Sequence, residues 1–203
     1  MKKIFLSALL YVMLISMNYE SSNATCLPGW STYNGAVLNI FGCDYYIEVC
    51  FKCTPTNSKS VKLNGYSKVD QSCISSTTNE ADIMNEIVNR ITDANFIYSN
   101  LCIGSTPVPC DEYDAGEFYS IGVYRCWEKK WFDDYLWTVP CETGDDLCYY
   151  MIKFCFNFQT NEWERKMTQP PMISTYFECP TVFPPNPPKP GTSACFHLNT
   201  ICD

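Results

Sequence analysis

Histidine is almost absent from this sequence: among 203 residues there is one, His197, which stands near the end between two cysteines. A Ser-His-Asp or Cys-His site needs a positioned imidazole base, and a lone histidine in a cysteine-rich tail is more often structural or exposed. The sequence also lacks a nucleophile elbow, a glycine-rich phosphate loop and a zinc-protease helix motif. We therefore predict no catalytic residues, no cofactor and a protein that is not an enzyme.

Basic residues are scarce as well. The chain has 14 Lys and Arg residues against 22 Asp and Glu residues, which gives a formal net charge of −8. A chain of this sign is not drawn electrostatically to nucleic acids or to anionic membranes. We expect no nucleic-acid partner.

Long apolar runs are limited to one, at the start. Lys2 and Lys3 precede the almost wholly apolar segment Ile4 to Met17, and small residues stand at Ser22 and Ala24. This is the layout of a cleavable signal peptide, and the run is shorter than the ~20 residues that a membrane span needs. We predict cleavage of residues 1–24, no membrane span afterwards and an extracellular location, with the periplasm or cell surface as alternatives.

Cysteine is the residue in abundance, with 14 copies, all after Ala24. Cys50-Phe-Lys-Cys53 has the spacing of a redox or zinc pair, but it lacks the following helix that a redox thiol uses and the second pair or histidines of a zinc site. An even count in an exported chain indicates a disulfide framework. We predict that every cysteine is in a disulfide: Cys26, Cys43, Cys50, Cys53, Cys73, Cys102, Cys110, Cys126, Cys141, Cys148, Cys155, Cys179, Cys195 and Cys202.

Three segments share one pattern, in which an aromatic residue, an isoleucine and a third apolar residue stand two apart. They are residues 45–49, 119–123 and 150–154, and each is followed within three residues by cysteine. This period is typical of strands with one buried face. Offsets of 31 and 105 residues superimpose the segments and their neighbouring cysteines. The sequence therefore predicts a mainly β, disulfide-rich fold of duplicated antiparallel β-hairpin units.

Return strands are expected after each copy. Turn residues at 54–57 and 159–162 precede segments around Val61 and Trp163, and residues 135–139 are the expected return strand of the middle copy. The longer offset also brings Cys50 onto Cys155, and nearly brings Cys73 onto Cys179. It predicts the equivalent bridges Cys50–Cys73 and Cys155–Cys179.

One segment, roughly residues 78–93, has the helical period of apolar residues instead. Thr77, just before it, and Glu80, near its start, have capping-box spacing. Its apolar residues predict one amphipathic α-helix with a single buried face: Ile83, Met84, Ile87, Val88 and Ile91.

Six prolines lie within residues 180–190, which excludes a helix or a central strand there and favours extended chain. We expect Cys195 and Cys202 to tie this segment down, to the body or to each other. The predicted organisation is a first hairpin unit with the helix over 25–107, the second and third units over 108–179, and a proline-rich strap over 180–203.

Two acidic loops follow Val-Pro-Cys sequences. Their oxygens are ligands that calcium takes, although neither loop has regular calcium-loop spacing and solvated turns are the alternative. The candidate ligands are Asp111, Asp114, Glu142 and Asp145.

Four tryptophans lie on or near the expected hairpins: Trp127, Trp131, Trp137 and Trp163. Exposed on a sheet, they would stack on sugars or anchor a protein; the alternative is packing in the core. Our first hypothesis is thus a secreted, non-catalytic module that binds an extracellular protein, a polysaccharide or its own copies. The alternatives are a secreted carboxylate-dependent hydrolase and a protease-resistant inhibitor or effector.

Overall fold

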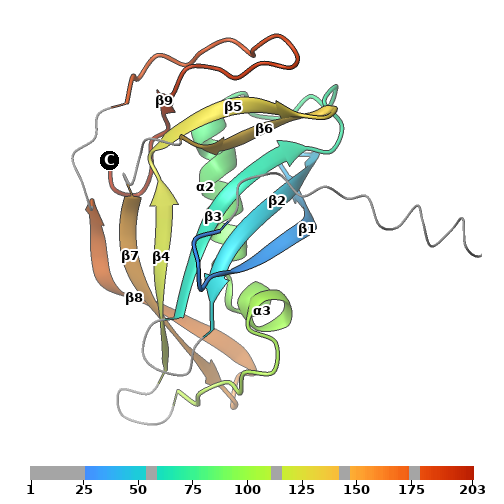
Figure 1. Cartoon of the computed structure of the whole chain (residues 1–203). Helices are drawn as coiled ribbons and strands as arrows, with labels where there is room; N and C mark the ends of the chain where they lie inside the picture. Colours follow the sequence, from blue (N-terminus) through green and yellow to red (C-terminus); the bar gives the residue numbers. More distant parts are fainter. Residues whose placement is uncertain (1–25, 54–58, 111–115, 142–146, 174–178) are drawn as a thin grey trace, which may run out of the picture.

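A computed structural model describes residues 26–53, 59–110, 116–141, 147–173 and 179–203 (Figure 1). The predicted signal peptide, the turn expected at 54–57 and the four candidate calcium ligands lie outside the described residues.

Strands dominate the described chain, as the sequence predicted, and nine of them join in one sheet. Their bounds are β1 (Ser31–Ile40), β2 (Cys43–Lys52), β3 (Lys59–Lys68), β4 (Glu117–Tyr124), β5 (Cys126–Phe132), β6 (Tyr135–Pro140), β7 (Leu147–Asn157), β8 (Glu162–Ile173) and β9 (Phe196–His197).

Strand β3 lies at the centre of the sheet, and its two halves bond to different partners on one edge. Lys59–Lys62 pair in parallel with β4, whereas Tyr66 and Ser67 pair antiparallel with β6. The other edge of β3 pairs with β2, which pairs with β1. The sheet therefore forks: β4, β7 and β8 form one branch, and β6, β5 and β9 form the other (Figure 1).

A β-bulge marks the fork. Glu48 of β2 faces Gly65 and Val49 faces Leu63, so Asn64 is an extra residue on β3. Bulges bend the strand that carries them and increase its twist. A Cβ atom on Gly65 would lie 3.2 Å from Cγ1 of Val139, so the glycine permits the close approach of β6.

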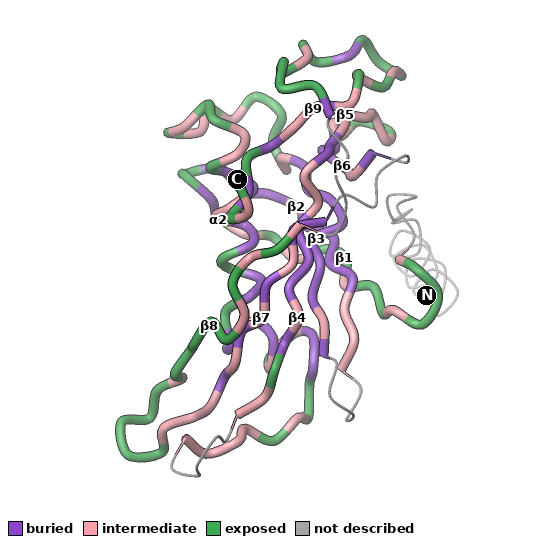
Figure 2. The backbone as a smooth tube through the Cα atoms, turned by 90° about the vertical axis from the view of Figure 1, so that its left-hand side faces the viewer, coloured by how far each residue is buried: buried purple, intermediate pink, exposed green. Residues whose placement is uncertain are grey.

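The parallel pairing of β3 with β4 requires a crossover, and this crossover contains the helices. These are α2 (Glu80–Ile91), the short α3 (Ala94–Phe96) and a π-helical turn, η1 (Ile97–Leu101). All five predicted apolar residues of α2 are buried against the sheet, in one core with Ile47 and Leu63. Figure 2 shows the buried residues concentrated along β2, β3 and β4.

The helix begins two residues later than predicted, because a different residue caps it. The side chain of Asn79 accepts a hydrogen bond from the backbone N–H of Ala81, and Asn79 is the N-cap. Thr77 lies two residues before Asn79, and its hydroxyl oxygen accepts a hydrogen bond from the N–H of Asn79. Glu80 is thereby the first helical residue and its carboxylate is free for tertiary contacts.

The first and third predicted hairpins are present as β2–β3 and β7–β8. An additional hairpin joins β1 to β2 through Phe41 and Gly42, whose φ values of 51° and 85° suit a tight two-residue turn. The middle copy differs from the prediction. Both edges of β4 are occupied by β3 and β7, so the expected return strand, β6, pairs with β5 instead.

All 14 cysteines are paired, as predicted, but both predicted bridges are wrong. Strand β3 runs antiparallel to β2, so Cys73 comes to lie beside Cys43, roughly 23 Å along the strand from Cys50. The bridges are Cys26–Cys50, Cys43–Cys73, Cys53–Cys102, Cys110–Cys155, Cys126–Cys179, Cys141–Cys195 and Cys148–Cys202.

Residues 180–190, hereafter the proline strap, contain neither helix nor strand, as predicted. The strap lies against β5: the indole Nε1 of Trp131 donates to the carbonyl of Pro187 at 2.9 Å. Cys179 bonds to Cys126 before the strap, and Cys195 bonds to Cys141 after it. The tail is thus tied to the body of the molecule.

Glu48, beside the bulge, is a buried acid with 2% of its surface exposed. The side-chain amide of Asn64 donates to its Oε1 at 2.7 Å. Burial raises the pKa of Glu48 to about 7, and the hydrogen bond from Asn64 opposes this shift only in part.

This raised pKa predicts a pH-dependent stability. Between about pH 4.5 and 7 the unfolded chain releases the Glu48 proton while the folded chain retains it, so the free energy of unfolding falls as the pH rises. Glu48→Gln should stabilise the protein at pH 8 by on the order of 1–3 kcal/mol and have little effect at pH 4. Urea unfolding at both pH values measures this; the exposed Glu162→Gln is the control. Equal effects of Glu48→Gln at the two pH values would contradict the prediction.

The Cys43–Cys73 bridge gives a second prediction. It closes the loop that carries the chain from β3 towards α2, so the double variant Cys43→Ala/Cys73→Ala should lose about 2–5 kcal/mol of unfolding free energy. Peptide mapping of the oxidised protein should show Cys43 linked to Cys73; a Cys50–Cys73 peptide would refute this pairing.

Candidate functional site

A cavity of about 360 Å³ opens beside the fork, next to β6. Its walls are β2, β3, β5, β6, the loop after β3 and the first turn of α2, and the proline strap contributes Asn186. The polar residues that matter most in it are Tyr45, Tyr66, Glu80, Lys129, Thr138 and Asn186. We refer to this cavity as the fork pocket.

Glu80 is held in a fixed orientation at the first turn of α2. The hydroxyl of Tyr66 donates to its Oε1 at 3.1 Å, and the hydroxyl of Thr138 donates to the same oxygen at 3.2 Å. Tyr66 and Thr138 are register partners on β3 and β6, so the position of Glu80 depends on the pairing at the fork. Burial, followed by the charge of Glu80, raises the pKa of Tyr66 well above its usual value.

Lys129 of β5 is a cation buried in the wall of the fork pocket, with 8% of its surface exposed. Its Nζ donates to Oδ1 of Asn186 at 2.9 Å and lies 4.4 Å from the ring centre of Phe183. No carboxylate of the described residues lies within ion-pair distance of it. Burial lowers the pKa of Lys129, while the negative charge of Glu80 opposes that effect.

Tyr45 of β2 contributes a buried hydroxyl. Within the described chain this hydroxyl makes no hydrogen bond of normal geometry, although Ser75 interacts weakly with it. Burial, together with the charge of Glu80, raises the pKa of Tyr45 to about 12, so the hydroxyl stays protonated.

These groups are suited to binding. A carboxylate, an ammonium group and neutral hydroxyls converge on one cavity, whose volume falls in the range of small-molecule sites. Glu80 is the one acidic residue among the described residues that line it, whereas glycoside hydrolysis uses two facing carboxyl groups.

The structure places the four predicted tryptophans in packing contacts. Trp127 is fully buried beside Tyr66, and its Nε1 donates to the carbonyl of Tyr124 at 2.7 Å. Trp137 is also buried, at 7% exposure. Trp163 stacks on Tyr98 with ring centres 4.4 Å apart.

Trp131 is partly exposed and is covered on one side by the proline strap, with Nζ of Lys189 5.7 Å from its ring centre. The four side chains do not gather in one patch. Three of them lie on β5 and β6 in one branch of the sheet, and Trp163 lies on β8 in the other branch. Binding through these rings stays a prediction, and only Trp131 and Trp163 have partly exposed side chains.

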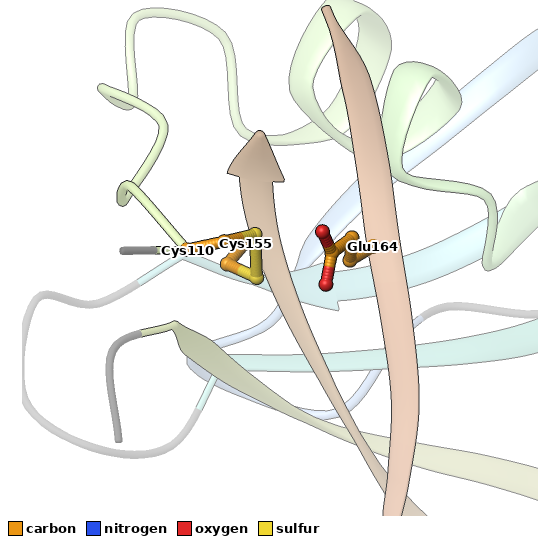
Figure 3. Close-up of side chains that lie close together, drawn as sticks. All are labelled: Cys110, Cys155 and Glu164. Atoms are coloured by element: carbon orange, nitrogen blue, oxygen red, sulfur yellow. A yellow bond between two sulfur atoms is a disulfide. The ribbon is translucent and has the colours of Figure 1, made fainter. Parts of the chain in front are cut away.

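A second cluster brings Cys110, Cys155 and Glu164 together at the far end of β7 and β8 (Figure 3). The two sulfur atoms are bonded to each other, so neither is a thiolate that could bind a metal ion. The Cys50-x-x-Cys53 pair is likewise not a redox or zinc pair, because its members bond to Cys26 and Cys102.

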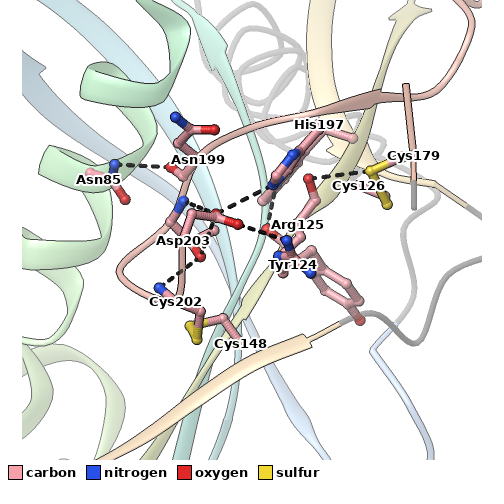
Figure 4. A network of polar contacts seen from close by, with 12 residues as sticks. Asn85, Tyr124, Arg125, Cys126, Cys148, Cys179, His197, Asn199, Cys202 and Asp203 are labelled. Carbon is pink, nitrogen blue, oxygen red and sulfur yellow. Dashed lines mark hydrogen bonds and ion pairs between the residues drawn. A yellow bond between two sulfur atoms is a disulfide. The ribbon is translucent and has the colours of Figure 1, made fainter. Parts of the chain in front are cut away.

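His197 takes part in a third cluster, at the C-terminal segment (Figure 4). Its Nε2 lies 3.3 Å from Oδ2 of Asp203, and Arg125 forms an ion pair with the other oxygen of Asp203 at 2.6 Å. The backbone N–H of Thr200 also donates to Asp203 at 2.7 Å. Burial alone would raise the pKa of the Asp203 carboxyl group. The hydrogen bonds from Thr200 and Arg125 and the charges of His197 and Arg125 outweigh burial, so this pKa is lowered. The cluster anchors the segment around Cys202, beside its bridge to Cys148.

Comparisons with known proteins supply no relative: the chain matches no protein-family model, no curated protein and no solved structure. In the parts of the chain that the structure describes, no helix has the length and apolar character needed to cross a membrane.

The unbonded hydroxyl of Tyr45 gives a prediction for the fork pocket. A buried hydroxyl without a partner destabilises the fold, typically by about 1–3 kcal/mol. Tyr45→Phe should therefore leave the free energy of unfolding unchanged or raise it by about 1 kcal/mol, as measured by urea unfolding. Tyr66→Phe is the matched control, because it deletes a hydroxyl that donates to Glu80, and it should lower stability. A clear loss of stability in Tyr45→Phe would show that the hydroxyl has a structural partner.

Proposed function

We propose that the protein is a secreted, non-catalytic binding module and that the fork pocket holds a small polar ligand. Seven disulfides, together with the lack of a membrane-spanning helix among the described residues, are compatible with an extracellular protein. The observation that carries the proposal is Lys129, a buried ammonium group that lines a cavity and contacts no carboxylate of the described residues.

The free-energy balance of Lys129 favours a ligand. A buried charge destabilises a protein unless it is paired, and here the described contacts are one amide oxygen and one aromatic ring. An acceptor group on a ligand would supply the missing partner. On this view Lys129 lowers the stability of the free protein, and the chain keeps it because it binds the ligand.

The walls of the pocket are held together by covalent bonds. Cys73 lines the cavity and bonds to Cys43 at the start of β2. Cys141, at the end of β6, bonds to Cys195, beyond the strap residue Asn186. A cavity fixed in this way loses little conformational freedom when a ligand enters, and such preorganisation strengthens binding.

A binding role fits the groups in the pocket better than catalysis does. The described lining residues include no histidine and no cysteine thiol, and among them Glu80 has no second carboxylate with which to divide acid and base roles. The carboxylate-dependent hydrolase, our earlier alternative, has no support from this geometry.

The proposal is tested by thermal denaturation of the oxidised protein against a library of small polar molecules at millimolar concentration. A ligand present at 100 times its Kd should raise the melting temperature by about 5–10 °C. Lys129→Met should abolish that rise. Lys130→Met, which changes the neighbouring residue on the opposite face of β5, should retain it. Hydrolysis of a library member, or rises that survive Lys129→Met, would contradict the proposal.

A further inference from the structure

We infer that the ligand of the fork pocket is a small zwitterion of the free amino acid class, with its ammonium group at Glu80 and its carboxylate at Lys129. This inference rests on the proposed function and specifies it. It follows from the way in which two opposite charges are held on one cavity without meeting.

Glu80 and Lys129 both line the fork pocket, and the charge of Glu80 acts to raise the pKa of Lys129 against the effect of burial. They nevertheless form no ion pair, since the described contacts of Glu80 are with two hydroxyls and those of Lys129 are with an amide and a ring. Two opposite charges that could neutralise each other are instead presented separately to the cavity.

The contacts of Glu80 leave one of its oxygens for a ligand. Tyr66 and Thr138 both donate to Oε1, and neither donates to Oε2. Both donors are neutral, so they orient the carboxylate without cancelling its charge. A carboxylate oriented in this way is suited to an ammonium group, because charge-assisted hydrogen bonds are roughly twice as strong as neutral ones.

The pocket also holds cationic groups. An ammonium group has three donors, and Lys129 uses one of them on Asn186. Lys68 also lines the cavity: its Nζ donates to the carbonyl of Cys73 at 2.9 Å, and its charge further lowers the pKa of Lys129. A ligand carboxylate would relieve the repulsion between these two lysines.

Other ligand classes satisfy only part of this arrangement. An anion would leave Glu80 without a counter-charge, and a simple cation would leave both lysines without one. A neutral sugar would hydrogen-bond to Glu80 and to the lysines but would neutralise neither charge. A molecule that carries both charges matches both groups, and a cavity of about 360 Å³ has room for a single amino acid.

The inference is tested by calorimetric titration of the full-length oxidised protein with three matched sets of probes. These are free L-amino acids, their methyl esters, which lack the carboxylate, and their N-acetyl derivatives, which lack the ammonium group. At least one free amino acid should bind, and its two derivatives should bind at least tenfold more weakly. This comparison uses the unaltered chain, so it does not depend on whether any variant folds.

Variants then show which residue binds each charged group of the ligand. Glu80→Gln keeps an oxygen that can accept from Tyr66 and Thr138. It should weaken the binding of the free amino acid, which should then bind no more tightly than its N-acetyl derivative. In Lys129→Met the free amino acid should bind no more tightly than its methyl ester. The matched controls Glu86→Gln and Lys130→Met, on the same elements but outside the pocket, should leave all three affinities unchanged.

The failures of the two proposals are distinguishable. A neutral sugar or a singly charged molecule could bind in place of free amino acids, and Lys129→Met could abolish that binding. The inference of a zwitterionic ligand is then wrong, whereas the proposal that the fork pocket is a binding site is retained. If neither these probes nor the polar library binds, both proposals fail.

Discussion

The pairing of β3 with two different strands along one edge determines the rest of this structure. The extra residue Asn64 and the side-chain-free Gly65 bend β3 in its middle, and the strand then continues beside β6 and not beside β4. The two branches separate at that point. Residues of β2, β3, β4 and β7 form most of the core with α2, and strands β3, β5 and β6 border a cavity at the start of the helix.

Buried polar groups lie on both sides of this bend. Glu48 with Asn64 is beside the bulge, and Glu80 with Lys129 is in the cavity. Each lowers stability relative to an apolar side chain of similar size, so the fold depends on other sources of stability. The apolar face of α2 is one source, and the seven disulfides, which restrict the unfolded chain, are the other.

The parts of the fold with local causes could be predicted from the sequence. Alternating apolar residues identified β2, β4 and β7, and the helical period identified α2, since both patterns arise within a single element. Disulfide pairing could not be predicted in the same way. The partner of Cys73 depends on which strand end lies next to it in space, and an offset between repeats does not contain that information.

The candidate site was missed for a similar reason. Lys129 belongs to a charged run that has the composition of a solvent-exposed segment, and Glu80 occupies a position where an acid commonly caps a helix. Their meeting requires the bulge, the pairing of β5 with β6 and the passage of the strap, and the bulge residue Asn64 and the strap residue Asn186 are 122 positions apart in the sequence. The tryptophans attracted attention through their type, yet Trp127 and Trp137 are used to fill the interior.

The two bridges that flank the proline strap also affect what a protease could do to this molecule. Cys179 and Cys195 are joined to different strands, β5 through Cys126 and the end of β6 through Cys141. A peptide bond cut between them would therefore release no fragment, and the nicked chain would keep its mass apart from one added water molecule. Such a cut would become visible in electrophoresis only after reduction, and the exposed strap could be cleaved without separating Asn186 and Lys129 from the same covalent body.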